Sequence, residues 1–284
     1  MIDLSSNSAD CFVPDDSGPE DAIRRTTHLG IGAHPDDLEV MALDGILSCF
    51  DSEDQWFSGV TVTDGAGSVT EGPYVSCSEE DLVEIRRQEQ RKAAVVGEYS
   101  IMWQLAHASS SVRDAAFHAH QSEIQRIVHE TRPNIVYTHN PADRHSTHVA
   151  VSVSVLRALQ QLPDDAKPDT VYGCEVWRDL DWLREEDRVE FDVSGMEHLA
   201  DALIGVFDSQ IRGGKRYHQA IEGRQRAHAT FNRPHEADEA SRLIYAMDLS
   251  SVIGPSGPDL SDFLQRHTNN FQTDVLEGLD TFEP

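Results

Sequence analysis

The stretch THLGIGAHPDDLEVMALDGILSCF, residues 27–50, determines the fold class. Its first six residues are a short apolar run suited to a buried strand. Pro35 then disfavours helix at the residue before it. From Leu38 to Phe50 apolar residues recur at helical spacing. The stretch therefore predicts a strand, a polar turn and a helix in succession.

The same unit recurs three more times before Pro163. Further strands are predicted at residues 55–63, 99–106 and 134–139, and further helices at 78–97, 112–132 and from the 140s to about 161. Ser78 to Asp81 has the pattern of a capping box at a helix start. Strand–helix alternation favours parallel crossovers. We expect a Rossmann-like three-layer α/β fold with a mainly parallel sheet and a C-terminal extension.

Composition shifts divide the chain into three parts. Residues 1–26 are rich in Ser, Asp, Pro and Gly and predict a flexible arm, whereas residues 27–250 predict a single domain. After Pro163 we expect strands and helices in a less regular order, with residues 243–249 compatible with either. Residues 251–284 predict an irregular tail.

Charge limits the partners of the protein. Asp and Glu number 50 and Lys and Arg 23, so the formal net charge is −27 and nucleic acid or an anionic membrane is a poor partner. Only three lysines occur in the 284 residues. An acid excess with scarce lysine favours a halophilic protein, because molar salt screens self-repulsion.

The cellular context follows from what the sequence lacks. No run of about 18 apolar residues predicts a membrane span, and the first ten residues do not form a secretory signal. The four cysteines are widely spaced and form no C-x-x-C pair, which is typical of a reducing compartment. We expect a cytoplasmic protein whose oligomeric state the sequence leaves open.

Two of the predicted strands end in loops rich in ionisable residues. The first loop contains His34, Asp36 and Asp37, and the second contains His145 and His148. Ligands of open α/β sheets bind at the carboxyl ends of the strands, and neighbouring strands one and four would bring these loops together. Mixed imidazole and carboxylate ligands favour Zn²⁺ or another divalent first-row metal.

The two loops together resemble the motifs of the LmbE-like, or phosphatidylinositol-glycan class L (PIG-L), family of zinc-dependent de-N-acetylases. The sequence AHPDD follows the first strand and H-x-x-H follows the fourth. Thr63-Asp64-Gly65, the helix pattern R-x-x-E-x-x-x-A-x-x-V-G from Arg86, and D-V-S with a later S-Q also match family segments. The resemblance runs from about residue 27 to 210.

The resemblance implies roles for individual residues. His34, Asp37 and His148 match the metal ligands, Asp36 matches the general base, and a protonated His145 matches the histidine that polarises the acyl oxygen. Two further residues, Arg86 and Asp64, are expected to contact substrate.

The second motif departs from the common H-P-D-H form, in which the aspartate orients the catalytic histidine. Here it is His145-Ser146-Thr147-His148, and Asp143 is the candidate substitute for the missing aspartate. The resemblance implies removal of an N-acetyl or other N-acyl group from an amino-sugar conjugate. A metalloamidase with a non-sugar substrate and a non-catalytic carbohydrate-binding relative are the alternatives.

Overall fold

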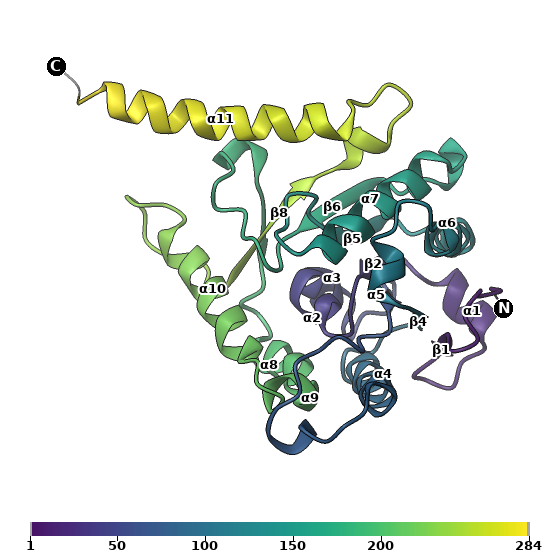
Figure 1. Ribbon diagram of the computed structural model, residues 1–284. Coiled ribbons are helices and arrows are strands. Elements are labelled where there is room, and N and C mark those ends of the chain that lie inside the picture. The colour runs from purple at the N-terminus through teal and green to yellow at the C-terminus, as the bar shows by residue number, and fades with distance from the viewer. Residues whose placement is uncertain (1, 283–284) are drawn as a thin grey trace.

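The computed structural model describes residues 2–282, and in these residues a single mixed sheet has the strand order β1-β4-β3-β2-β5-β6-β8-β7 (Figure 1). The strands are β1 (Asp10–Phe12), β2 (His28–Gly32), β3 (Phe57–Thr63), β4 (Met102–His107), β5 (Ile135–His139), β6 (Thr170–Cys174), β7 (Val189–Asp192) and β8 (Leu243–Asp248). The five central strands from β4 to β6 are parallel, and the remaining pairings are antiparallel. The predicted fold class is therefore confirmed.

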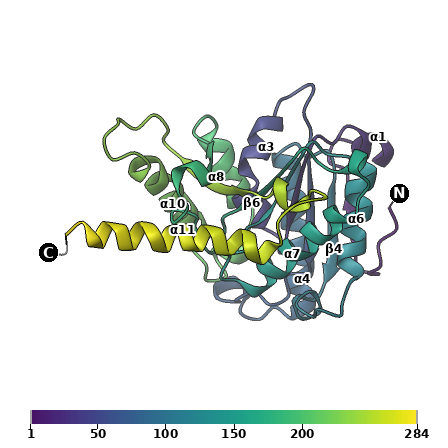
Figure 2. The same cartoon turned by 90° about the horizontal axis from the view of Figure 1, so that it is seen from above.

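Helices cover both faces of the sheet (Figures 1 and 2). The α-helices of the described residues are α1 (Pro19–Arg24), α2 (Asp37–Met41), α3 (Leu43–Cys49), α4 (Glu79–Val96), α5 (Ser109–Val112), α6 (Ala119–Thr131), α7 (Ser146–Gln160), α8 (Glu197–Gly205), α9 (Asp208–Ile211), α10 (Tyr217–Phe231) and α11 (Leu260–Asp280). One apolar core contains side chains of α1, α6 and α7, and a second contains those of α2, α3 and α8. The two cores correspond to the two faces of the sheet.

Close packing of α2 on the sheet positions the first polar loop. A Cβ added to Gly30 would lie 2.7 Å from Cζ of Phe57 and 3.0 Å from Cδ2 of Leu38. Only a residue without a side chain fits between the strand and the helix. The helix expected from Leu38 to Phe50 is interrupted at Ala42, which separates α2 from α3.

The N-terminal arm is more ordered than its composition indicates. Residues 10–12 pair with β4, and α1 packs against the sheet. The side chain and backbone of Ser5 also hydrogen-bond to the buried Glu123 of α6. Long-range contacts thus accompany regular structure in a segment without its own periodicity, and the flexibility of the arm stays a prediction. Met1 lies outside the described residues.

The C-terminal tail was expected to be irregular, but residues 260–280 form α11. Asp259 caps its N-terminus, Phe263 and His267 pack on the body of the protein, and Asp274 pairs with Arg184. The Gly- and Pro-rich start of the tail gave no indication of the amphipathic helix that follows it. The C-terminal end of this helix extends beyond the body of the protein in Figure 2. Residues 283–284 lie outside the described part, and the domain division stays a prediction.

None of the described helices has the length and apolar character needed to span a membrane.

Candidate metal and active site

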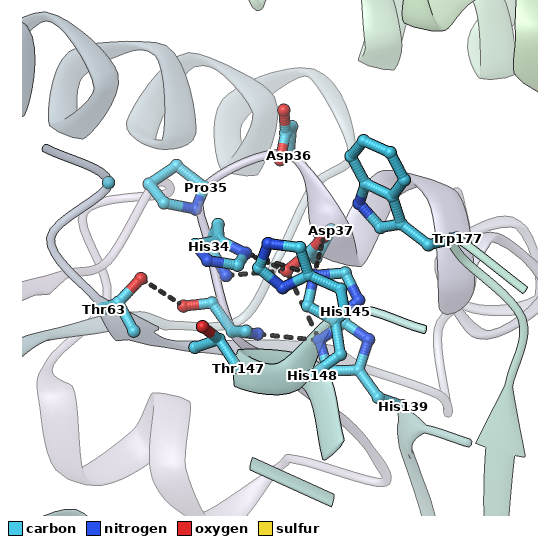
Figure 3. A network of polar contacts seen from close by, with 12 residues as sticks. His34, Pro35, Asp36, Asp37, Thr63, His139, His145, Thr147, His148 and Trp177 are labelled. Carbon is cyan, nitrogen blue, oxygen red and sulfur yellow. Dashed lines mark hydrogen bonds and ion pairs between the residues drawn. The ribbon is translucent and has the colours of Figure 1, made fainter. Parts of the chain in front are cut away.

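The two polar loops meet at one edge of the sheet. Strands β2 and β5 are parallel neighbours, so the loops that follow them lie at the same end, as the sequence predicts. The first loop contributes His34 and Asp37, and α7 contributes His148 from its first turn. Figure 3 shows their side chains directed toward one another.

The polar atoms of these three residues have the spacing of metal ligands. Nδ1 of His34 lies 3.1 Å from Oδ2 of Asp37 and 3.2 Å from Nε2 of His148, which lies 3.4 Å from Oδ1 of Asp37. Ligands at about 2.0–2.2 Å from a tetrahedral Zn²⁺ are about 3.4 Å apart. The donor set therefore fits a divalent metal that accepts nitrogen and oxygen.

His139 lies in the same cluster but has a different hydrogen-bond role. Its ring stacks on that of His148 with centroids 3.9 Å apart, and its Nε2 lies 3.3 Å from Asp37. The backbone N–H of Ala33 donates to this Nε2 at 2.9 Å, which occupies the lone pair that a metal would need. Burial lowers the pKa of His139 to about 4, so the neutral ring is favoured beside His148 and Asp37.

Asp143 contacts a different histidine from the one expected. Its Oδ2 lies 3.4 Å from Nδ1 of His148 and accepts the backbone N–H of Trp177, while Oδ1 accepts the backbone N–H of His145. None of these contacts involves the ring of His145, so the expectation that Asp143 orients that ring is wrong. With a metal bound, this carboxylate would favour the tautomer of His148 that carries its proton on Nδ1 and leaves Nε2 free as a ligand.

Asp36 stands apart from the ligand cluster. Its φ of 96° lies in the left-handed region, which turns its side chain away from that of Asp37 (Figure 3). Oδ1 of Asp36 lies 3.3 Å from a guanidinium nitrogen of Arg86. Burial raises the pKa of Asp36, Arg86 opposes the shift, and the charges of Asp37 and Glu39 add to it. The carboxyl group is thus available to hold a proton.

His145 precedes α7 and lines the cavity. Its ring stacks on Trp177 with centroids 5.8 Å apart, and its buried Nδ1 has no hydrogen-bond partner among the described residues. Burial and the neighbouring His148 and His34 lower the pKa of His145 to about 4. The protonated form expected from the resemblance is therefore disfavoured, and the neutral ring offers one N–H donor.

The two expected substrate contacts differ in their surroundings. Arg86 is buried, hydrogen-bonds to the carbonyl oxygens of Gly65 and Pro35, and lines the cavity beside the cluster. Asp64 is not among the residues that line this cavity, and its carboxylate accepts the backbone N–H of Ala66. Asp64 therefore stabilises a turn, whereas Arg86 faces the site.

A cavity of about 650 Å³ opens beside the cluster. His34, Asp36, Asp37 and His145 form part of its wall. Residues from α10 and from the segment after β6, including Tyr217 and Trp177, form another part of the wall, and these were not predicted as site residues. The signals available in the sequence for Trp177 were its position after a strand end and its aromatic ring, which is suited to stacking on a sugar.

An open α/β sheet with a buried histidine–aspartate cluster at its strand ends defines the class: an α/β protein with a candidate metal site. Within this class the family is specific. The PIG-L family model, described as GlcNAc-PI de-N-acetylase, matches residues 29–159. The match includes both polar loops and confirms the resemblance.

Solved structures share the fold at low identity. N,N'-diacetylchitobiose deacetylase from Pyrococcus horikoshii is 15% identical over 83% of this chain and 88% of its own, with a TM-score of 0.63. 4-Carboxy-2-hydroxymuconate hydratase from Pseudomonas putida is 15% identical over 79% of this chain and 96% of its own, with a TM-score of 0.57. The zinc-inhibited form of a teicoplanin deacetylase is 14% identical over 78% of this chain and 98% of its own, with a TM-score of 0.53. No curated protein matches the sequence.

Proposed function

We propose that the protein is a metal-dependent hydrolase that removes an N-acetyl or other N-acyl group from an amino-sugar conjugate of the N-acetylglucosamine type. The observation that carries the proposal is the spacing of His34, Asp37 and His148 at 3.1–3.4 Å beside an open cavity. The family of residues 29–159 supports the same reaction.

The ligand atoms would be Nδ1 of His34, a carboxylate oxygen of Asp37 and Nε2 of His148. Zn²⁺ is the first choice for this donor set, and another first-row divalent cation also fits. A bound cation of this kind polarises an amide carbonyl and lowers the pKa of water. Because one similar deacetylase was solved in a zinc-inhibited form, the metal concentration has to be varied in any assay.

Two residues would move or hold protons. The carboxylate of Asp36 would accept a proton from the attacking water and transfer it to the departing amine nitrogen. The neutral ring of His145 would donate a hydrogen bond to the acyl oxygen as negative charge develops there. Arg86 would keep Asp36 at the cavity wall through their 3.3 Å contact.

The fold alone does not fix this reaction, because a hydratase has a TM-score close to those of the deacetylases. The test is hydrolysis by protein stripped with a chelator and reloaded with Zn²⁺, Co²⁺ or Mn²⁺. Acetate and free amine should appear from N-acetylglucosamine conjugates, and less from N-acetyl amino acids. The opposite preference would favour a non-sugar metalloamidase.

The His148→Gln variant is the control for the ligand set, since it should lose both metal and turnover. Metal-loaded protein that hydrolyses none of the N-acyl compounds would contradict the proposal and favour a binding role. We further infer a cytoplasmic, halophilic protein, and sedimentation analysis at high salt will give its oligomeric state.

A further inference from the structure

The side chain of His145 lacks the polar support that other residues of the proposed reaction have. Asp36 contacts Arg86 at 3.3 Å. Asp143 lies 3.4 Å from Nδ1 of His148. The buried Nδ1 of His145, by contrast, has no hydrogen-bond partner among the described residues. A donor contributes to a reaction only when it is held in the productive direction, so the orientation of this ring depends on its packing.

The ring of Trp177 packs against that of His145 (Figure 3). The two centroids are 5.8 Å apart and the planes differ by 26°, which is an offset stack. The rings of His34 and His148 also lie near His145, with centroids 5.1 Å and 4.5 Å away. Both of these belong to the proposed ligand set. Trp177 therefore supplies the aromatic contact from outside the metal cluster.

One buried carboxylate connects the backbones of the two stacked residues. Oδ1 of Asp143 accepts the backbone N–H of His145 at 2.9 Å, and Oδ2 accepts the backbone N–H of Trp177 at 3.1 Å. The segment after β6 is thereby attached to the residue that precedes α7. Because both rings extend from backbones held by the same group, these two hydrogen bonds set the distance between the rings.

The turn that carries Trp177 is closed by Glu175. Its Oε2 accepts the backbone N–H of Leu180 at 3.1 Å, and its Oε1 accepts the backbone N–H of Tyr245 in β8 at 3.2 Å. Nε2 of His228 in α10 lies 3.0 Å from the same carboxylate group, and the ring of His228 stacks on Tyr245. Glu175 and His228 are only 3% and 8% exposed, and the proposed reaction uses neither of them. Removing one partner would leave a buried polar group unpaired, so the pair anchors the base of the turn.

We propose that Trp177 is a positioning residue, which holds the ring of His145 in the direction needed to donate a hydrogen bond to the acyl oxygen, and that the Glu175–His228 pair fixes the turn carrying Trp177. This inference rests on the proposed function. The second side-chain torsion of histidine has only broad intrinsic preferences, so a stacked neighbour determines the direction of the ring. Stacking occupies neither ring nitrogen, and one N–H stays available for the substrate.

The kinetic test uses zinc-loaded protein and an N-acetylglucosamine conjugate that the original protein hydrolyses. Trp177→Leu removes the stacked ring, and kcat should fall about 10–100-fold because a misdirected donor loses much of its effect. Trp177→Phe keeps a ring and should restore kcat to within about threefold of the original value. Trp182→Leu is the matched control, since Trp182 lies in the same segment but does not line the cavity. Its kcat should equal that of the original protein.

A second comparison separates positioning from direct contact with the substrate. In the His145→Ala protein, Trp177→Leu should change kcat by less than about twofold, because the ring that Trp177 positions is gone. If Trp177 acted on the substrate alone, the loss would be the same with and without His145 and would lie mainly in KM. That result would overturn the inference and leave the proposed hydrolase intact.

The ring resonances of His145 test the inference without any turnover. In protein labelled with ¹³C-histidine, these resonances are the ones missing from the spectrum of His145→Ala. Trp177→Leu should shift them through loss of the indole ring current, whereas Trp182→Leu should not. Resonances of His145 that stay unchanged in Trp177→Leu would exclude the stack, whether or not the protein hydrolyses an N-acyl sugar.

The same spectra test the buried pair. Glu175→Gln should shift the His145 resonances in the same direction as Trp177→Leu but by less, and Glu186→Gln, at an exposed position of the same segment, should leave them in place. Melting curves show whether each variant is folded. If Glu175→Gln does not fold, His228→Gln removes the other partner and gives the same comparison. Unchanged His145 resonances in a folded variant of the pair would remove Glu175 and His228 from the proposal.

Discussion

At the scale of single residues, the neighbouring Asp36 and Asp37 have different surroundings because the backbone turns between them. Asp36 has φ 96° and ψ −22°, a conformation that side chains other than Asn and Asp rarely adopt. Asp37 begins α2 and points into the histidine cluster. One carboxylate is therefore available as a ligand and the other as a base.

Replacement of Asp36 by Asn tests this division. The amide is nearly the same size and keeps the turn, but it cannot accept a proton, so kcat should fall by about 10²–10⁴-fold. Metal content, measured by mass spectrometry, should stay that of the original protein. Near-normal turnover with full metal content would remove Asp36 from the mechanism.

Asp143 gives a second prediction at this scale. Because its carboxylate lies against Nδ1 of His148, Asp143→Asn should weaken metal binding about 10–100-fold. Competition with a fluorescent chelator measures this affinity. The matched control is Asp64→Asn, whose carboxylate caps a turn outside the cavity. Equal metal affinity in both variants would contradict the role given to Asp143.

At the scale of elements, the neighbouring positions of β2 and β5 were predictable, because apolar runs ending in polar loops identify parallel strands. That His34, Asp37 and His148 lie together could be predicted for the same reason, whereas their role as metal ligands is implied by the resemblance and stays a prediction. Which histidine ring Asp143 contacts could not be predicted, since the direction of a side chain depends on tertiary packing. Strand β8 inserts between β6 and β7, and no local pattern indicates such a long-range pairing.

The contact between α2 and β2 can be tested at Gly30. In Gly30→Ala the new Cβ would meet Phe57 at 2.7 Å and Leu38 at 3.0 Å, and this overpacking should cost about 1–3 kcal/mol. Urea unfolding measures the loss. Gly223→Ala in α10 is the control, because nothing lies within 4 Å of its new methyl group and alanine favours helix. Gly30→Ala should lower the free energy of unfolding, and Gly223→Ala should raise it.

The contact between α6 and α7 predicts a pH dependence. His120 of α6 is buried against Ser154 of α7, and burial, aided by His107, lowers its pKa to about 4 against the opposing charge of Glu123. The unfolded chain therefore binds more protons between about pH 6.5 and 4. Stability due to this group is complete above that window and is lost as the pH falls through it.

The variant His120→Gln removes this group while keeping a polar side chain near Ser154. Its free energy of unfolding should fall less between pH 7 and pH 5 than that of the original protein, by about 1–2 kcal/mol. His235 is exposed, so His235→Gln should leave the pH dependence of the free energy of unfolding unchanged. An equal slope in all three proteins would exclude His120 as its source.

At the scale of the whole molecule, acidic and basic residues are distributed unevenly between the outer surface and the cavity wall. The outer surface carries most of an excess of −27, while the cavity wall collects four of the 23 basic residues. The excess keeps copies of the protein apart but destabilises the folded chain through self-repulsion. Exposed ion pairs such as Arg226–Glu197 compensate little, because such pairs contribute about 0–1 kcal/mol.

Salt should therefore stabilise the protein. Raising KCl from 0.1 to 2 M shortens the screening length from about 10 Å to below about 3 Å, which removes most of the repulsion between surface carboxylates. We expect the melting temperature to rise by about 5 °C or more. The Glu53→Lys/Asp54→Lys variant, changed at exposed positions without ion pairs among the described residues, should gain less from the same salt. A melting temperature independent of KCl would show that the acidic excess has no part in stability, and the halophilic interpretation would then be wrong.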